Sequence, residues 1–203
     1  MLASIPSELL RALRLTLVVA ALTGLVYPFL ITGIAQLAFN NQANGSLVTR
    51  NGQVVGSKLI GQQFTSDRYF HGRPSATVNA SSGKPQPYAA DNSAGSNYGP
   101  SNQALIDRVK KDVQTVRQQD GLPANASVPA DLVTTSFSGF DPDISEASAL
   151  LQVDRVAAAR HLDSGKVRAL VEAHVQGRVL GIFGEPHVNV LELNTALDSG
   201  GAS

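Results

Sequence analysis

The feature that most constrains this chain is an uncharged apolar segment near its N-terminus. Residues 15–49 contain no Asp, Glu, Lys or Arg, and residues 15–39 are mostly apolar. A helix rises about 1.5 Å per residue and the hydrocarbon core of a bilayer is about 30 Å thick, so about 20 apolar residues can cross it. The segment is longer than the h-region of a cleaved signal peptide, and Ala35 and Ala38 lack the spacing of a cleavage site. We therefore predict a retained transmembrane helix over residues 15–39.

The basic residues beside this segment predict its orientation. Arg11 and Arg14 precede it, and the next basic residue is Arg50. Because short cytoplasmic segments are enriched in Lys and Arg, we expect the N-terminus in the cytoplasm. The chain is then a single-pass protein of the cell (inner) membrane, in contact with lipid. Its predicted parts are a cytoplasmic N-terminus (1–14), the transmembrane helix (15–39), a polar tether (40–51) and an extracytoplasmic soluble domain (52–203).

Residues other than large aliphatics recur at steps of four along the apolar segment. Small residues at this spacing let another membrane helix approach closely. A strict step of four drifts about 40° per turn, so only three or four of them share one face, and Pro28 is expected to kink the helix. The alternative is that small residues are simply common in membrane helices. The series is Thr16, Ala20, Gly24, Pro28, Thr32 and Gln36, of which Ala20, Gly24, Pro28 and Thr32 are the predicted packing ridge.

Composition excludes several classes of function. The chain has 16 basic and 16 acidic residues, so it lacks the excess positive charge of a nucleic-acid binder. It has no Cys, which excludes disulfides, zinc thiolates and a Cys nucleophile. It has no Trp and only 5% aromatic residues, which argues against a stacking platform for bases or sugars.

About 160 residues follow the apolar segment, enough for one hydrophobic core. Patterning predicts short strands in 52–64, a long ordered loop over 65–100, and a helix capped by Ser101 that ends before Gly121. Strands and helices then alternate, which indicates an α/β or α+β fold with a small mixed sheet. The later predicted elements are a strand at 132–135, a helix from Asp141-Pro142 to Arg160, a helix capped by Ser164, and a strand passing into a short helix over 187–197.

The sequence contains few motifs that indicate catalysis, nucleotide binding or metal binding. Neither Gly83-Lys84 nor Gly165-Lys166 is followed by Ser or Thr, so no phosphate-binding P-loop is present. The four histidines lack metal-ligand spacing. His174 lies on an apolar helix face and is expected to be a core residue, whereas His71 lies in a polar loop. We expect no catalytic residue, metal site or cofactor of its own. The competing readings are a membrane-anchored hydrolase of the cell envelope, which requires a nucleophile and base in contact, and an anchored envelope-binding module.

Several loop segments combine Gly and Pro with polar residues. They are either tight turns that hold a small domain together or a rigid surface that docks on a partner. The segments are YFHGRPSA (69–76), GSNYGPSN (95–102), VPADLVTTSFSGFDPDIS (128–145) and GEPHVNVLELNTAL (184–197).

These segments also carry a resemblance to a known family. Together with LTGLVYPFLITGIAQ (22–36), GSKLIGQQF (56–64) and QVDRVAAAR (152–160), they resemble, in order and over nearly the whole chain, the C subunit of the Kdp-type potassium-transporting ATPase. Phe137 and Phe140 depart from the smaller or aliphatic residues usual at their positions.

The resemblance implies an accessory, non-catalytic subunit needed for assembly and activity of a high-affinity potassium pump. Its partners are a channel-like potassium-binding subunit, a P-type ATP-hydrolysing subunit and a very small fourth subunit. ATP and K⁺ are handled by the complex, and the family's C subunit is described as a catalytic chaperone that raises the ATP affinity of the hydrolysing subunit. An extracytoplasmic domain cannot reach cytoplasmic ATP. Either the effect is transmitted through the membrane by a change of pump conformation, or the predicted orientation is wrong.

Under this reading the exported domain covers the outer opening of the channel-like subunit. The loops over 65–102 are its predicted docking surface. The candidate contacts are Tyr69, His71, Arg73, Asn97 and Ser101.

Overall fold

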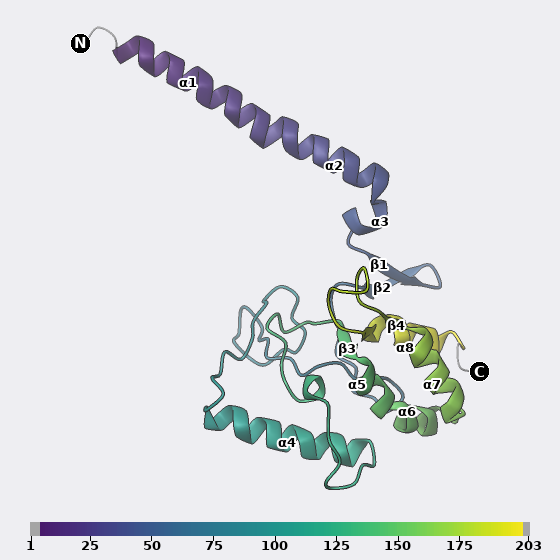
Figure 1. The fold of residues 1–203 in the computed structure, drawn as a ribbon. Helices are drawn as coiled ribbons and strands as arrows, with labels where there is room; N and C mark the ends of the chain where they lie inside the picture. The colour runs from purple at the N-terminus through teal and green to yellow at the C-terminus, as the bar shows by residue number, and fades with distance from the viewer. Residues whose placement is uncertain (1–4, 201–203) are drawn as a thin grey trace. The chain divides into compact units, whose positions relative to one another are not determined.

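The computed structural model describes residues 5–200 and divides into two compact units, separated between Leu47 and Val48 (Figure 1). The first unit is mainly one long helix. It consists of α1 (Ile5–Ala21), the π-helical turn η2 (Leu22–Val26) and α2 (Tyr27–Ala38). Over its 34 residues it is long and apolar enough to cross a membrane, and none of its residues in the apolar window is buried by the protein.

The π-helical turn lies immediately before Pro28, where the sequence predicts a kink. Pro28 has no N–H to donate, so the regular hydrogen-bond ladder is interrupted there. The backbone N–H of Tyr27 instead reaches back to the carbonyl of Leu22, five residues earlier. Thr23 Oγ1 donates to the Val19 carbonyl at 2.8 Å. The disturbance at Pro28 thus takes the form of a local π turn, a common way for a helix to absorb such a break.

The segment predicted as a tether contains regular structure. A short helix, α3 (Asn40–Ala43), follows α2. Asn44 Nδ2 donates to the Asn40 carbonyl at 2.7 Å and to Gln36 Oε1 at 3.1 Å. These side-chain hydrogen bonds connect α3 and Asn44 to the C-terminal end of α2.

The second unit contains two small sheets. Strands β1 (Leu47–Arg50) and β2 (Gln53–Ser57) form a hairpin whose turn residues, Asn51 and Gly52, have positive φ angles of 50° and 78°. Such angles suit the tight turns that join paired strands. A three-stranded antiparallel sheet has the order β3–β5–β4. Its strands are β3 (Asp143–Ser145), β5 (His187–Asn189) and β4 (Val175–Gln176).

Four helices pack around the three-stranded sheet and bury the core. They are α5 (Glu146–Leu151), α6 (Val153–Arg160), α7 (Ser164–Ala173) and α8 (Val190–Asp198). This combination of helices and small sheets confirms the predicted fold class. The core residues with the least exposed surface include Phe70, Ile144, Val153, Val156, Val167, Val171, Val188 and Leu193.

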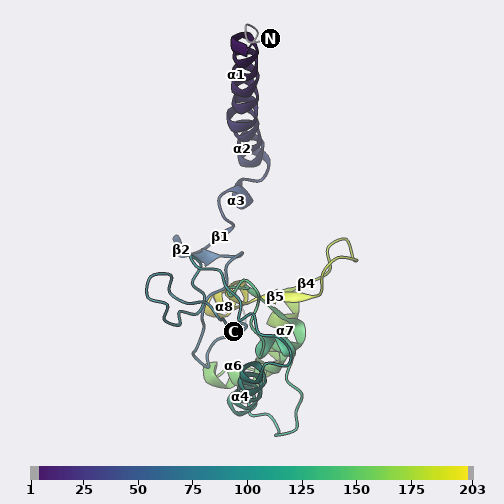
Figure 2. The same ribbon diagram turned by 90° about the vertical axis from the view of Figure 1, so that its left-hand side faces the viewer.

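Helix α4 (Gln103–Gln119) lies apart from this cluster at one end of the domain (Figures 1 and 2). Its predicted apolar face is only half-buried. Asn102, not Ser101, caps it, because the Asn102 side chain accepts the N–H of Ala104 at 2.9 Å. In the same way Asp163, not Ser164, caps α7.

Two predicted elements between residues 130 and 146 are wrong. The β-prone run 132–135 follows the 3₁₀ turn η3 (Ala130–Leu132) and is not a strand, because its residues lie in loop contacts instead of a ladder. No helix begins at Asp141-Pro142. Residues Asp143–Ser145 pair with β5, and α5 starts at Glu146 with Ser145 as its cap. Sheet pairing therefore overrides the local preference for a helix start.

Candidate docking surface

The long loop between β2 and α4 is held by side-chain hydrogen bonds in place of regular structure. Ser75 Oγ donates to the Gly139 carbonyl at 2.6 Å and accepts the N–H of Tyr88 at 3.0 Å. Thr77 Oγ1 donates to the Gln86 carbonyl at 2.6 Å. These bonds join segments 69–76 and 134–141 into one ordered surface, as the loop prediction requires.

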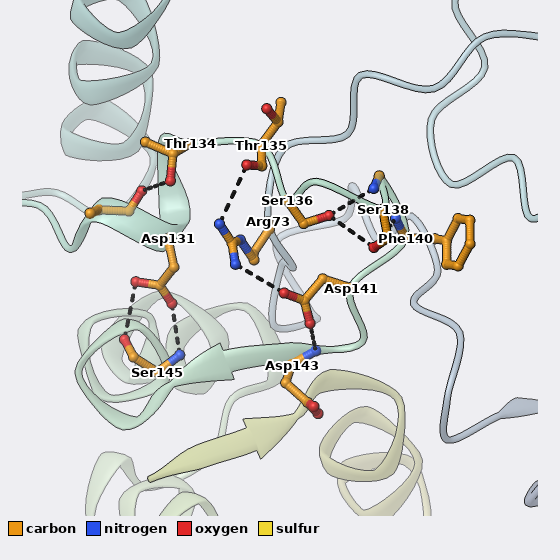
Figure 3. Close-up of polar contacts among 12 residues, drawn as sticks. Arg73, Asp131, Thr134, Thr135, Ser136, Ser138, Phe140, Asp141, Asp143 and Ser145 are labelled. Atoms are coloured by element: carbon orange, nitrogen blue, oxygen red, sulfur yellow. Dashed lines mark hydrogen bonds and ion pairs between the residues drawn. The ribbon is translucent and has the colours of Figure 1, made fainter. Parts of the chain in front are cut away.

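Arg73 is at the centre of this surface (Figure 3). Its guanidinium lies 2.9 Å from Asp141 Oδ2, with both side chains about one quarter exposed, and also reaches the Thr135 carbonyl at 3.4 Å. Asp141 Oδ1 accepts the N–H of Asp143 at 3.1 Å. The pair therefore ties the YFHGRPSA segment to the start of β3. Among residues 5–200, Arg73 Nε is buried without a hydrogen-bond partner.

A second carboxylate organises the neighbouring turn. Asp131 accepts the N–H and the hydroxyl of Ser145 at 2.7 and 3.1 Å (Figure 3). It also accepts the hydroxyl of Ser148 at 2.7 Å. Negative charge at a helix N-terminus is favourable. Asp131 thus fixes η3 against the start of α5, and the polar residues of TTSFSGFDPDIS serve local structure.

The structure separates the five candidate contacts into two groups. Tyr69 and His71 are half-buried: the Tyr69 hydroxyl donates to Asp198 at 3.0 Å, and the backbone N–H of His71 donates to Gln152 Oε1 at 2.8 Å. Arg73 is half-buried in its ion pair. Asn97 and Ser101 are exposed, and Asn97 has a left-handed φ of 53°. Of the five candidates, only these two are exposed.

A buried ion pair beneath these loops is absent from the sequence-based candidates. Arg155 Nε lies 2.7 Å from Asp120 Oδ1, and the two side chains are 5% and 4% exposed. Arg155 also donates to the carbonyls of Asp67 and Tyr69 and to Gln152 Oε1. In the sequence, the sign of this pair is Arg155, a charged residue within the segment QVDRVAAAR. The pattern of that segment predicted a helix but did not identify an ionic partner for Arg155.

Asp198 forms ion pairs with two arginines. Arg50 and Arg160 each lie 2.7 Å from one of its oxygens, and Arg160 also stacks 4.8 Å above the Tyr69 ring. Burial alone would raise the pKa of Asp198, but hydrogen bonds from Arg160 and Tyr69 and the nearby positive charges lower it overall. The cluster joins β1, the loop at Tyr69 and α8.

A cavity of about 290 Å³ opens beside the Arg73 pair. Burial, followed by the Arg155 charge, lowers the pKa of His71. Burial, followed by the Asp141 charge, raises the pKa of Tyr88 to about 12. Burial also raises the pKa of Asp112. The cavity therefore favours the neutral form of each of these three groups. Its polar lining includes His71, Arg73, Tyr88, Asp112, Asp120 and Gln152.

Three of the four histidines are hydrogen-bonded through the ring to the backbone. Ring nitrogens of His71, His174 and His187 contact backbone carbonyls at 3.1, 2.8 and 2.9 Å. Within residues 5–200, no group of three His, Asp or Glu side chains is placed to hold a metal ion. His174, predicted as a core residue, is hydrogen-bonded at the end of α7 but only half-buried, because it lies at the C-cap of the helix.

The most exposed large apolar side chains of this domain lie at two places. Phe137, one of the two departures from the family pattern, is 86% exposed at the tip of the 134–141 loop. The other place is the connection between β4 and β5, where Val179, Leu180, Ile182 and Phe183 are 63–84% exposed. Exposed apolar clusters of this kind mark contact surfaces.

The comparisons with known proteins all point to the same family. A family model described as the c chain of K⁺-transporting ATPase (KdpC) matches residues 9–199. Proteins named potassium-transporting ATPase KdpC subunit from Methylobacterium nodulans, Rhodopseudomonas palustris (strain BisB18) and Bradyrhizobium diazoefficiens are 57%, 54% and 52% identical to it. The alignments cover 94–96% of this chain and 98% of each relative.

Proposed function

The chain belongs to the KdpC family of K⁺-transporting ATPase subunits, and from this premise we propose that it serves a potassium pump as a membrane-anchored accessory subunit without catalysis of its own. The observation that carries the proposal is the family match along nearly the whole chain, from residue 9 to residue 199. Its partners are the channel-like, ATP-hydrolysing and small fourth subunits.

We propose that the membrane-spanning helix anchors the chain with the second unit outside the cytoplasm. Arg11 and Arg14 flank one end of the apolar segment, and positively charged flanks favour the cytoplasmic side. Since the chain has no Cys, single cysteines report topology without background. A membrane-impermeant maleimide should label Ala124→Cys in cells with a permeabilised outer membrane and label Ala12→Cys only after lysis. The reverse pattern would reject this orientation.

The surface around Arg73 is proposed to dock on the outer face of the channel-like subunit. Rigid loops suit this role because little conformational entropy is lost on binding. Asn97, Ser101 and Phe137 expose their side chains there. Ser101→Arg should reduce retention of the chain by the pump in mild detergent. Ala124→Arg, which adds the same group to an exposed loop beyond α4, is the control. Equal retention of both variants would remove Ser101 from the surface.

Arg73 itself tests whether this surface affects transport. In the Arg73→Glu variant, a second carboxylate lies beside that of Asp141. Repulsion between the two should separate the loop segments that the ion pair joins. We expect weaker retention or a higher K⁺ concentration for half-maximal transport, whereas Arg168→Glu on an exposed face of α7 should change neither. Unchanged retention and K⁺ dependence in Arg73→Glu would exclude the pair from the docking surface.

The effect on ATP is proposed to pass through the membrane. A chain outside the cytoplasm cannot touch ATP, but it can favour the pump conformation that binds ATP more tightly. A coupling of about 1.4 kcal/mol corresponds to a tenfold change in affinity. A photoreactive ATP analogue should therefore label the hydrolysing subunit and not this chain. Labelling of this chain within an active complex would require direct contact instead.

A further inference from the structure

The connection between β4 and β5 carries four large apolar side chains into solvent. Residues 177–186 project from the body of the domain (Figure 2). Val179, Leu180, Ile182 and Phe183 are 65%, 84%, 70% and 63% exposed, and we call them the apolar tip. Arg178 and Glu185, which form an ion pair at 2.6 Å, flank the tip. No charged residue lies between them in the sequence.

The backbone of the tip satisfies its own hydrogen bonds. The N–H groups of Val179 and Phe183 donate to each other's carbonyls at 2.8 and 3.0 Å. Gly181 and Ile182 donate to the carbonyls of Arg178 and Val179 at 3.0 and 3.2 Å. Backbone polar groups must be paired internally before a segment can leave water for a hydrocarbon environment. The apolar tip meets this requirement at four of its N–H groups.

The turn is also held in an unusual backbone conformation. Leu180 has a φ of 55°, in the left-handed region that a branched apolar side chain rarely adopts. Gly181 follows with a φ of 73°. Leu180 is also 84% exposed, so burial within the domain does not account for an apolar side chain at this position. Strain of this kind is typical of contact sites.

The position of the tip in the domain indicates what it meets. In Figures 1 and 2 it lies at the same end of the domain as the β1–β2 hairpin, through which the chain enters from the long helix. Residues 39–47 join the helix to this hairpin, and nine residues span at most about 30 Å. This connection keeps the β1–β2 hairpin within about 30 Å of the end of the long helix. Val54 on β2 is a further exposed apolar residue there, at 57%.

We propose that the apolar tip inserts into the interfacial region of the phospholipid bilayer beside the transmembrane helix. A bilayer surface accepts separate apolar projections at one level, such as the tip and β2, whereas a protein pocket takes a single convex element. The Arg178–Glu185 pair then lies at the level of the headgroups. Insertion gives the domain a second attachment to the membrane and fixes its tilt beside the pump.

The experiment uses the full chain, alone, in vesicles. Because the chain has no Trp, Phe183→Trp places a single fluorophore in the tip. Ala124→Trp places the matched control in the loop after α4, at the opposite end of the domain (Figures 1 and 2). The vesicles contain phosphatidylcholine with or without brominated acyl chains, which quench tryptophan only on contact.

We expect blue-shifted emission from Phe183→Trp and at least about twofold quenching by brominated chains, with neither effect in Ala124→Trp. Adding Leu180→Asp and Ile182→Asp to the Phe183→Trp chain should abolish the quenching. Water-like, unquenched emission from Phe183→Trp would overturn the proposal. So would a blue shift that appears only with the pump subunits present and without lipid quenching, because the tip then fills a protein pocket. No pump subunit enters the first measurement, so its result is independent of the proposed function.

Discussion

Arg155 Nε lies 2.7 Å from Asp120 Oδ1, and both side chains are almost completely buried. The pair joins α6 to the end of α4, and the same guanidinium holds the carbonyls of Asp67 and Tyr69. This arginine is therefore one of the anchors that hold the loop with the candidate docking residues to the core, beside the buried Phe70. Helix α4 has no fully buried residue of its own, so it depends on such contacts.

Removing this arginine should destabilise the domain strongly. Arg155→Met leaves the Asp120 carboxylate buried without a counter-charge, and breaking one side of a buried pair costs about 3–5 kcal/mol. Urea unfolding of the full chain in detergent measures the loss. Arg168→Met, on the exposed face of α7, should change the free energy of unfolding by less than about 0.5 kcal/mol. Equal stability of the two variants would show that the Arg155 pair contributes little.

His71 should make stability depend on pH. Burial, then the Arg155 charge, lowers its pKa from 6.5 against the opposing effects of the Ser66 carbonyl, Asp120 and Asp67. The unfolded chain therefore takes up a proton first as the pH falls. The stabilisation is complete above 6.5 and is lost as the pH falls through the lower folded pKa.

His71→Gln should consequently lose less stability than the parent between about pH 7 and pH 5. The control is His161→Asn, which replaces an exposed histidine at the left-handed end of α6, where Asn is well tolerated. Parallel pH profiles of the parent and His71→Gln chains would contradict the assignment.

Gly139 should be the least replaceable glycine of the docking loops. Its φ is 80°, and an added Cβ would lie 2.6 Å from the Ala94 carbonyl and closer still to Thr77 Cγ2. Backbone strain and overpacking together predict a loss of about 3 kcal/mol for Gly139→Ala. Gly177→Ala, where a Cβ meets nothing within 4 Å, is the matched control. Thermal unfolding compares the two, and similar midpoints would argue against a rigid loop joint.

Gly24 tests the predicted packing ridge of the membrane helix. Gly24→Leu fills the surface on which another helix is expected to lie, so co-purification of the pump subunits should fall several-fold. Gly33→Leu makes the same change nine residues later, about 180° around a regular helix. Neither side chain would meet anything within the chain itself. If both variants reduce co-purification equally, the added side-chain volume causes the loss, and its position on the predicted ridge does not matter.

Local patterning predicted the elements whose cause is local. The apolar segment, α4 from its spaced aliphatics, the end of α6 at Arg160 and the strand-to-helix passage at 187–198 all follow from periodicity and capping residues. The combination of helices with a small sheet followed from their alternation. Of the two errors around residues 132–146, the wrong helix start arose because Asp143–Ser145 pairs with β5, which is distant in sequence, whereas the run 132–135 lies in loop contacts.

The site was less predictable for the same reason. Arg73 was singled out as a polar loop residue, but its partner Asp141 lies 68 positions away and no local pattern joins them. Tyr69 and His71 were predicted as contacts on the docking loops. The Tyr69 hydroxyl is bonded to Asp198, the backbone N–H of His71 is bonded to Gln152, and both residues are half-buried. The apolar tip was present in the sequence as RVLGIFGE, but its exposure depends on the whole domain.

The central claim is that this chain works as a subunit of a potassium pump, and co-purification tests it most directly. The tagged full chain is isolated in mild detergent from its own host grown short of potassium. We predict that a P-type ATPase subunit and a channel-like subunit elute with it in fixed proportion. Recovery of the chain alone, from membranes shown to contain both subunits, would contradict the account.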